Sequence, residues 1–134
     1  MNSIALWIAQ TLASAFLAVL FLQSGLDKVL DWKGNKDYIA GFFSKTPLRK
    51  FSTVMLLQIT LLEMLAGIVS AAGCLTVLVT RASAIAFAGA VLSGISIVAL
   101  FFGQRIAKDY AAAAGMVPYA IFAIGSVLVQ GASL

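Results

Sequence analysis

One acidic residue, Glu63, stands inside a long apolar run and is the first candidate for chemistry in this chain. It is the only charged residue within positions 54–72. A carboxylate near the middle of a membrane span costs about 2.5–3.5 kcal/mol on insertion scales, so it should face other helices or water and have a partner. Thr60, Glu63, Gly67 and Ser70 follow one another at spacings of three, four and three residues and so share one helix face. We therefore expect Glu63 to point into the interior of a helix bundle.

Two roles are open for this carboxylate. In the first, Glu63 only hydrogen-bonds a neighbouring helix and holds the bundle together. In the second, it binds a ligand or handles a proton, because ionisable groups inside a membrane often mark functional sites. The sequence alone does not choose between these two roles.

Other polar side chains are expected where the apolar segments end. Gln23 and Asp27 are four residues apart and so share a helix face. Pairing of Asp27 with Arg105, or of Lys28 with Asp109, could link two helix ends. The alternative is that these groups are helix-end ion pairs and lipid anchors. The candidate cofactor-binding residues are Gln23, Asp27, Glu63, Tyr110 and Tyr119.

The composition indicates a membrane protein. Of the 134 residues, 62% are hydrophobic and 10% are charged, and mean hydropathy is +1.04; soluble domains are roughly 45–50% apolar and about 25% charged. The net charge of +4 comes from loops beside apolar spans, which indicates membrane topology and not nucleic-acid binding. There is no His and a single Cys, Cys74. We therefore expect no metal site, and electron transfer would need an organic cofactor or a partner subunit.

Four apolar segments predict an all-α, four-helix transmembrane bundle that forms one integral membrane domain over residues 1–134. The predicted spans are about 4–26, 53–72, 82–102 and 111–129. Residues 73–81 are expected to form a link, although the apolar stretch 75–79 could extend a helix. Pro118 predicts a mild kink in the last span.

The only sizeable loop, residues 28–50, contains a second helical pattern. Tyr38, Ile39, Phe42 and Phe43 form one apolar stripe of a short helix, which should stop near Pro47. We expect it to be an amphipathic helix that lies in the membrane interface between helices one and two.

The segment from Phe21 to Asp31 reads FLQSGLDKVLD, and Glu63 precedes Gly67 by four residues. These stretches resemble the DoxX-like family of small four-helix membrane proteins, whose pattern is roughly F-x-x-S-G-x-x-K followed by E-x-x-x-G in helix two. Ser24, Gly25, Lys28, Glu63 and Gly67 match that pattern. The family includes the small membrane subunit of a thiosulfate:quinone oxidoreductase and membrane partners of sulfur-transfer or superoxide-handling enzymes.

The resemblance implies an accessory subunit of a membrane-associated oxidoreductase complex, with quinone as the candidate cofactor. Its partners would be the lipid bilayer and other membrane subunits. The family provides no catalytic residue set, so the chain is not expected to catalyse a reaction alone. Two other functions remain open: a structural subunit that assembles a larger complex, and a small transporter that couples to protons through Glu63.

Basic residues predict the orientation. The first loop has six Lys or Arg and the third has two, whereas the second has Arg81 alone. Because Lys and Arg are enriched in cytoplasmic loops, the first and third loops should be cytoplasmic and both termini external. The expected location is the bacterial inner membrane, with several passes.

Cysteine labelling checks this orientation. With Cys74 replaced by Ser, cysteines introduced at Asn2 and Lys36 are exposed to an impermeant maleimide in whole cells. We expect labelling at Asn2 and none at Lys36. Labelling at Lys36 but not at Asn2 would reverse the assignment.

Overall fold

The computed structural model describes residues 3–134, and the regular secondary structure of this part of the chain is entirely helical, without strands. The helical elements in chain order are α1 (Ser3–Leu30), α2 (Trp32–Phe42), the short 3-10 turn η1 (Arg49–Phe51), α3 (Ser52–Thr80), α4 (Ala84–Ile106), α5 (Tyr110–Gly115) and α6 (Val117–Gly131). Four segments are long and apolar enough to cross a membrane: 3–30, 49–80, 84–106 and 110–131. The predicted all-α four-helix transmembrane bundle is confirmed.

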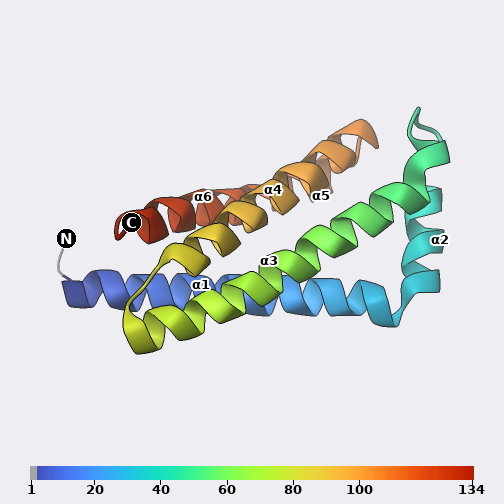
Figure 1. Cartoon of the computed structure of the whole chain (residues 1–134). Helices are drawn as coiled ribbons and strands as arrows, with labels where there is room; N and C mark the ends of the chain where they lie inside the picture. Colours follow the sequence, from blue (N-terminus) through green and yellow to red (C-terminus); the bar gives the residue numbers. More distant parts are fainter. Residues whose placement is uncertain (1–2) are drawn as a thin grey trace.

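The long helices lie alongside one another, and α3 is the central element (Figure 1). It packs mainly against α1 on one side and α4 on the other, and α6 packs against α4. In contrast, α2 runs across one end of the bundle, where it contacts α3 and α1 (Figure 1). The bundle therefore has one end that α2 covers and one end formed only by the long helices and their links.

Several helices are longer than the sequence predicted. The first helix continues to Leu30, and α3 continues through the expected link at 73–81 as far as Thr80. Arg81 ends α3 in the left-handed conformation, with φ 60°, and its N–H bonds the Val77 carbonyl. The link to α4 therefore shrinks to three residues. The alternative that the apolar stretch 75–79 extends a helix is correct, because nothing in that stretch breaks a helix.

The last span and the loop helix also differ from the prediction in detail. The last span is interrupted at Met116, between α5 and α6, and Pro118 lies in the first turn of α6. That position suits proline, because the first helical N–H groups have no partner within the helix. The loop helix α2 begins at Trp32, before the first residue of the predicted apolar stripe, because the Asp31 side chain caps it by accepting the Gly34 N–H at 3.3 Å. It ends at Phe42, before the predicted stop near Pro47.

Many of the buried side chains are small or polar and surround a few large apolar ones such as Leu17, Phe21 and Ile97, whereas most other large apolar side chains face outward. The most exposed aliphatic side chains on the four spans include Leu12, Val19, Leu61, Val98 and Leu128. The buried hydroxyls include Ser14, Ser93 and Ser126, each of which donates to the carbonyl four residues earlier. This distribution fits a bundle whose solvent is lipid, where small residues let helices approach closely.

The end of the bundle that lies away from α2 is closed by hydrogen bonds. The Trp7 Nε1 donates to the Val77 carbonyl at 2.8 Å, and the Arg81 guanidinium lies 5.0 Å from the Trp7 ring centre. Gln10 on α1 and Gln130 on α6 each donate a hydrogen bond to a backbone carbonyl of the other's helix. Gln130 Nε2 donates to the Gln10 carbonyl at 2.9 Å. These bonds join α1, α3 and α6 at this end.

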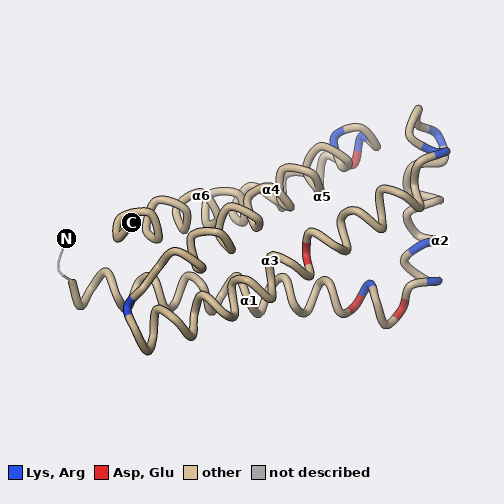
Figure 2. Tube along the Cα trace, viewed as in Figure 1, with Lys and Arg blue, Asp and Glu red and all other residues tan. Residues whose placement is uncertain are grey.

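Charge is distributed very unevenly between the two ends. Figure 2 shows most of the basic residues gathered at the end that carries α2. Arg81, which ends α3, lies at the other end over the Trp7 ring. One acidic residue, Glu63, lies well inside a long helix (Figure 2). The first and third loops thus lie at the same end of the bundle, as expected for four spans. The isolated Glu63 carboxylate needs a partner of opposite charge inside the bundle.

Close contact between α1 and α3 depends on Gly67. A Cβ on this residue would lie 2.7 Å from the backbone nitrogen of Leu22, a contact that cannot form without moving the helices apart. Gly67→Ala should therefore lower the free energy of unfolding by about 1–3 kcal/mol. Unfolding in mixed micelles, followed by circular dichroism, measures this loss.

Gly94→Ala on α4 is the matched control, because a Cβ there would meet nothing within 4 Å. Alanine is the better helix former, so this variant should be as stable as the wild type or more stable. Equal stability of Gly67→Ala and Gly94→Ala would contradict the close packing of α1 on α3.

Candidate functional site

Glu63 is fully buried and pairs with Lys28 of α1. The Lys28 Nζ donates to Glu63 Oε2 at 3.1 Å, and the exposed fractions of the two side chains are 17% and 0%. The same Nζ bonds the Ser24 Oγ at 3.1 Å. The expectation that Glu63 faces the interior is confirmed, and its helix neighbours Thr60 and Ser70 are also buried. Lys28 is the partner that a carboxylate in this position needs.

The buried stripe of α1 brings Lys28 to this place. Residues three or four apart along one face of the helix lead to it: Gln10, Ser14, Leu17, Phe21, Gly25 and Lys28. The first five are buried, and Lys28 continues their spacing at the end of the helix. Its long side chain can therefore reach along α3 to Glu63 while its backbone stays near the helix end.

Two glycines let the helices come close enough for this pair. A Cβ on Gly25 would lie 2.6 Å from the sulfur of Met64, and Gly67 faces the backbone of Leu22. Gly25 and Gly67 thus remove bulk from the α1–α3 contact next to the ion pair. Together with Ser24, which accepts a hydrogen bond from the ammonium, the matching residues Gly25, Lys28, Glu63 and Gly67 form one structural unit.

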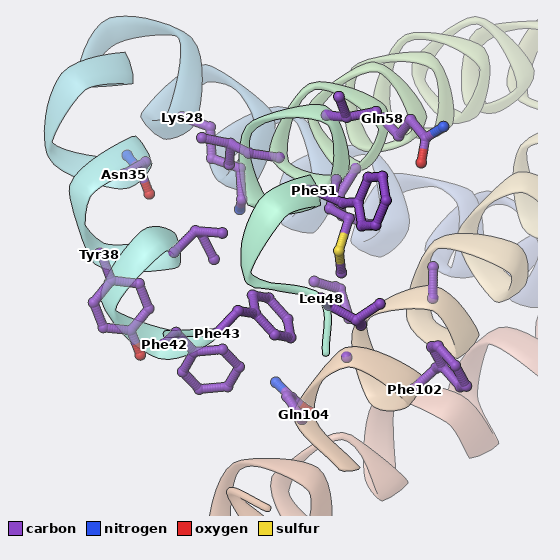
Figure 3. Close-up of a pocket in the computed structure, with 18 of the residues that line it drawn as sticks. Lys28, Asn35, Tyr38, Phe42, Phe43, Leu48, Phe51, Gln58, Phe102 and Gln104 are labelled. Atoms are coloured by element: carbon purple, nitrogen blue, oxygen red, sulfur yellow. The ribbon is translucent and has the colours of Figure 1, made fainter. Parts of the chain in front are cut away.

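A cavity of about 660 Å³ lies beside this unit, beneath α2 (Figure 3). This is within the usual size range of small-molecule sites, ~300–1,000 Å³. Most of its lining comes from α2, η1, the link between them, α3 and α4, including Ile39, Phe42, Phe43, Phe51, Met55, Ile59, Leu62 and Phe102. The polar residues of the lining are Lys28, Asn35, Tyr38, Gln58, Gln104 and Asp109. The arrangement suits a flat or chain-like apolar molecule with a few polar atoms.

Two buried acceptor atoms at this end of the bundle have no hydrogen-bond partner. They are Glu63 Oε1 and Gln104 Oε1. Gln104 lines the cavity directly, whereas Glu63 lies behind Lys28. A buried acceptor without a donor costs free energy, more so when it is charged. Both atoms are enclosed by protein, so neither oxygen is exposed to the cavity.

The structure does not bring the predicted cofactor-binding residues together. Of the five, only Glu63 is buried; Gln23, Asp27, Tyr110 and Tyr119 are exposed, and none of these four lines the cavity. Gln23 and Asp27 do share a face, but the buried stripe of α1 runs along another one. The Arg105 guanidinium stacks over Tyr110, 4.7 Å from the ring centre. Tyr119 does not reach Glu63.

The ion pairs suggested between helix ends are also absent from residues 3–134, where Lys28–Glu63 is the one ion pair. Asp109 instead caps α5 by accepting the Ala112 N–H at 3.1 Å. Lys28 turns to Glu63, because a fully buried carboxylate gains more from a cation than a helix-capping one does. The described residues also hold no group of three His, Cys, Asp or Glu side chains that could bind a metal.

The fold and this site define a small multi-pass membrane protein whose first two spans are joined by a buried ion pair. Comparison with family models assigns it further. The DoxX model matches residues 9–105, more than half of the chain, and the chain belongs to the DoxX family. The match includes α1 to α4 almost completely and thus the whole Lys28–Glu63 unit. No curated protein matches the chain, and no solved structure matches it.

Breaking the ion pair on one side should destabilise the bundle strongly. Lys28→Met leaves Glu63 without its cation, and Glu63→Leu leaves Lys28 without its anion. A buried pair that loses one member typically costs about 3–5 kcal/mol, whereas replacing both members by apolar groups can be neutral. We expect a large loss of unfolding free energy in each single variant and recovery of most of it in the double variant.

Lys33→Met, at an exposed position of α2, is the matched control and should change little. Glu63→Gln keeps an acceptor for Lys28 and should fold with a smaller loss than Glu63→Leu. If the losses of the two single variants simply add in the double variant, Lys28 and Glu63 do not act as a pair.

Proposed function

We propose that this DoxX protein is an accessory subunit of a membrane-associated oxidoreductase complex and holds a quinone in the cavity beneath α2. The observation that carries the proposal is the cavity itself. It combines aromatic and aliphatic walls with a few polar side chains, and it lies where the long helices end and α2 crosses them. A lipid-soluble head group would find apolar contact and hydrogen bonds there together.

The charge at the cavity wall favours a neutral ligand. Lys28 alone would attract an anionic head group, but Glu63 neutralises it at 3.1 Å. A further charge placed in this apolar space would have no partner and would be costly to desolvate. Quinones and their reduced forms are neutral, and they offer oxygen atoms to Lys28 and Gln104.

Electron transfer is assigned to a partner. The chain has no His and a single Cys, so it provides neither the commonest haem ligand nor a dithiol. Bound quinone would supply the redox chemistry, while the residues of this chain bind and orient it. Docking of the partner is proposed at the basic end, where Lys36, Arg49 and Lys108 are exposed and each adjoins a cavity-lining residue in the sequence. We propose that this end is cytoplasmic in a bacterial inner membrane.

Photo-crosslinking tests the quinone site. An azido-quinone is incorporated with the purified protein in bilayers, and labelled peptides are mapped with and without excess unlabelled quinone. We expect label that excess unlabelled quinone removes, and we expect it within residues 35–62 or 99–112, the two segments that contain most of the cavity lining. Label spread over the lipid-facing residues of α6, or label that is not competed, would overturn the site.

Ala99→Phe and Ala88→Phe make a matched pair for this test. Both alanines are exposed on α4, but only Ala99 lines the cavity. The first variant should lose at least about nine-tenths of the competed label by filling the space, whereas the second should keep it. Purification in mild detergent then tests the partner: an oxidoreductase should copurify, and partners without any quinone would favour a purely structural subunit.

A further inference from the structure

We infer that Glu63 sets the charge specificity of the cavity beneath α2 by keeping anionic lipids out of it. The inference rests on the proposed function and names the residue that determines which ligands the same site accepts. Glu63 does not line the cavity, so it acts from behind Lys28 and touches no ligand. The placement of charges around the cavity carries the inference.

Lys28 is the cation that an anionic ligand would meet. Among residues 3–134, the charged side chains that line the cavity are Lys28 and Asp109. Lys28 keeps 17% of its side chain exposed, and Figure 3 shows it at the cavity wall, on the same side as Asn35 of α2. Asp109 caps α5 and carries a negative charge, so it does not attract an anion.

Glu63 is the one described carboxylate within ion-pair distance of Lys28. Its Oε2 lies 3.1 Å from the Lys28 Nζ, and the other side chain that accepts from this ammonium, Ser24, is neutral. Charges interact strongly beside apolar walls, where water screens them little. An ammonium without Glu63 would therefore attract an anion, whereas the pair offers an entering anion no net opposite charge in return for its lost hydration.

Anionic lipids are the competitors that this end of the bundle collects. Basic side chains at a membrane surface attract acidic phospholipids, and the first and third loops expose Lys33, Lys36, Lys45, Arg49, Lys50, Arg105 and Lys108. The cavity is open to its surroundings, because Tyr38, Phe51, Val54 and Phe102 both line it and are exposed. Its apolar walls suit an acyl chain, so an unpaired Lys28 would complete a site for an anionic lipid.

Two ligands that differ mainly in charge measure this specificity. A decyl-naphthoquinone with a methoxy group beside one carbonyl is neutral, and the matched compound with a hydroxyl there is ionised at neutral pH. Each is titrated into protein in phosphatidylcholine nanodiscs, and bound ligand is extracted and quantified above the background from Ala99→Phe nanodiscs. We expect the neutral compound to bind at least about tenfold more tightly to the wild type.

Glu63→Gln keeps an acceptor for Lys28 and removes the charge. The ratio of anionic to neutral affinity should rise at least about tenfold, because the ammonium is no longer compensated. In Lys28→Met/Glu63→Leu the cation is absent as well, so the ratio should not exceed the wild-type value. Asp37→Asn is the matched control: it removes an exposed carboxylate of α2 that does not line the cavity, and it should leave the ratio unchanged.

Phosphatidylglycerol tests the exclusion of a lipid directly. When it replaces part of the phosphatidylcholine, the affinity for the neutral compound should fall several-fold in Glu63→Gln, because the lipid competes for the cavity. The wild type should keep its affinity. An equal fall in both proteins would contradict the exclusion of anionic lipids by Glu63.

The outcomes separate the two proposals. Binding of neither compound above the Ala99→Phe background would overturn the proposed quinone site, and the inference with it. Equal binding of the two compounds to the wild type, or tighter binding of the anion, would overturn the inference alone, and this comparison needs no substitution at the ion pair. A ratio that is unchanged in Glu63→Gln, or that rises equally in Asp37→Asn, would overturn the role of Glu63.

Discussion

The structure depends on one constraint, which is that a carboxylate buried among lipid-facing helices must be paired. Glu63 is fully buried on α3 and finds its cation on α1, at 3.1 Å. This pairing needs α1 and α3 to lie close together, and Gly25 and Gly67 permit it because neither has a side chain at the contact. The residues that match the family pattern are thus explained by packing and charge together, and no member of the set is independent of the others.

The two ends of the bundle differ in what their polar groups do. At the end formed by the long helices alone, Gln10 and Gln130 hydrogen-bond the neighbouring helices and close the bundle. At the end with α2, polar side chains border a cavity of about 660 Å³. The cavity at one end and the hydrogen bonds that join the helices at the other are the physical reason for placing function beneath α2 and stability at the opposite end.

Hydropathy and spacing predicted the four spans and the inward direction of Glu63, because both follow from local periodicity along one helix. The partner of Glu63 was missed, since the four-residue spacing of Gln23 and Asp27 drew attention to a face of α1 that proves to be exposed. The stripe that leads from Phe21 and Gly25 to Lys28 was visible in the sequence. The cavity could not be predicted, because it depends on how α2 crosses the bundle, which no local pattern determines.

The central claim is that Lys28 and Glu63 are in direct contact within the membrane. Glu63 is the only glutamate in the chain, so ¹³C labelling of glutamate side-chain carboxyl groups marks this single site. Solid-state NMR in lipid bilayers can then detect dipolar coupling of that carbon to ¹⁵N-labelled lysine Nζ. The account predicts strong dephasing, consistent with the 3.1 Å contact between Nζ and Oε2, and its loss in Lys28→Met. Absence of dephasing in the wild type would contradict it.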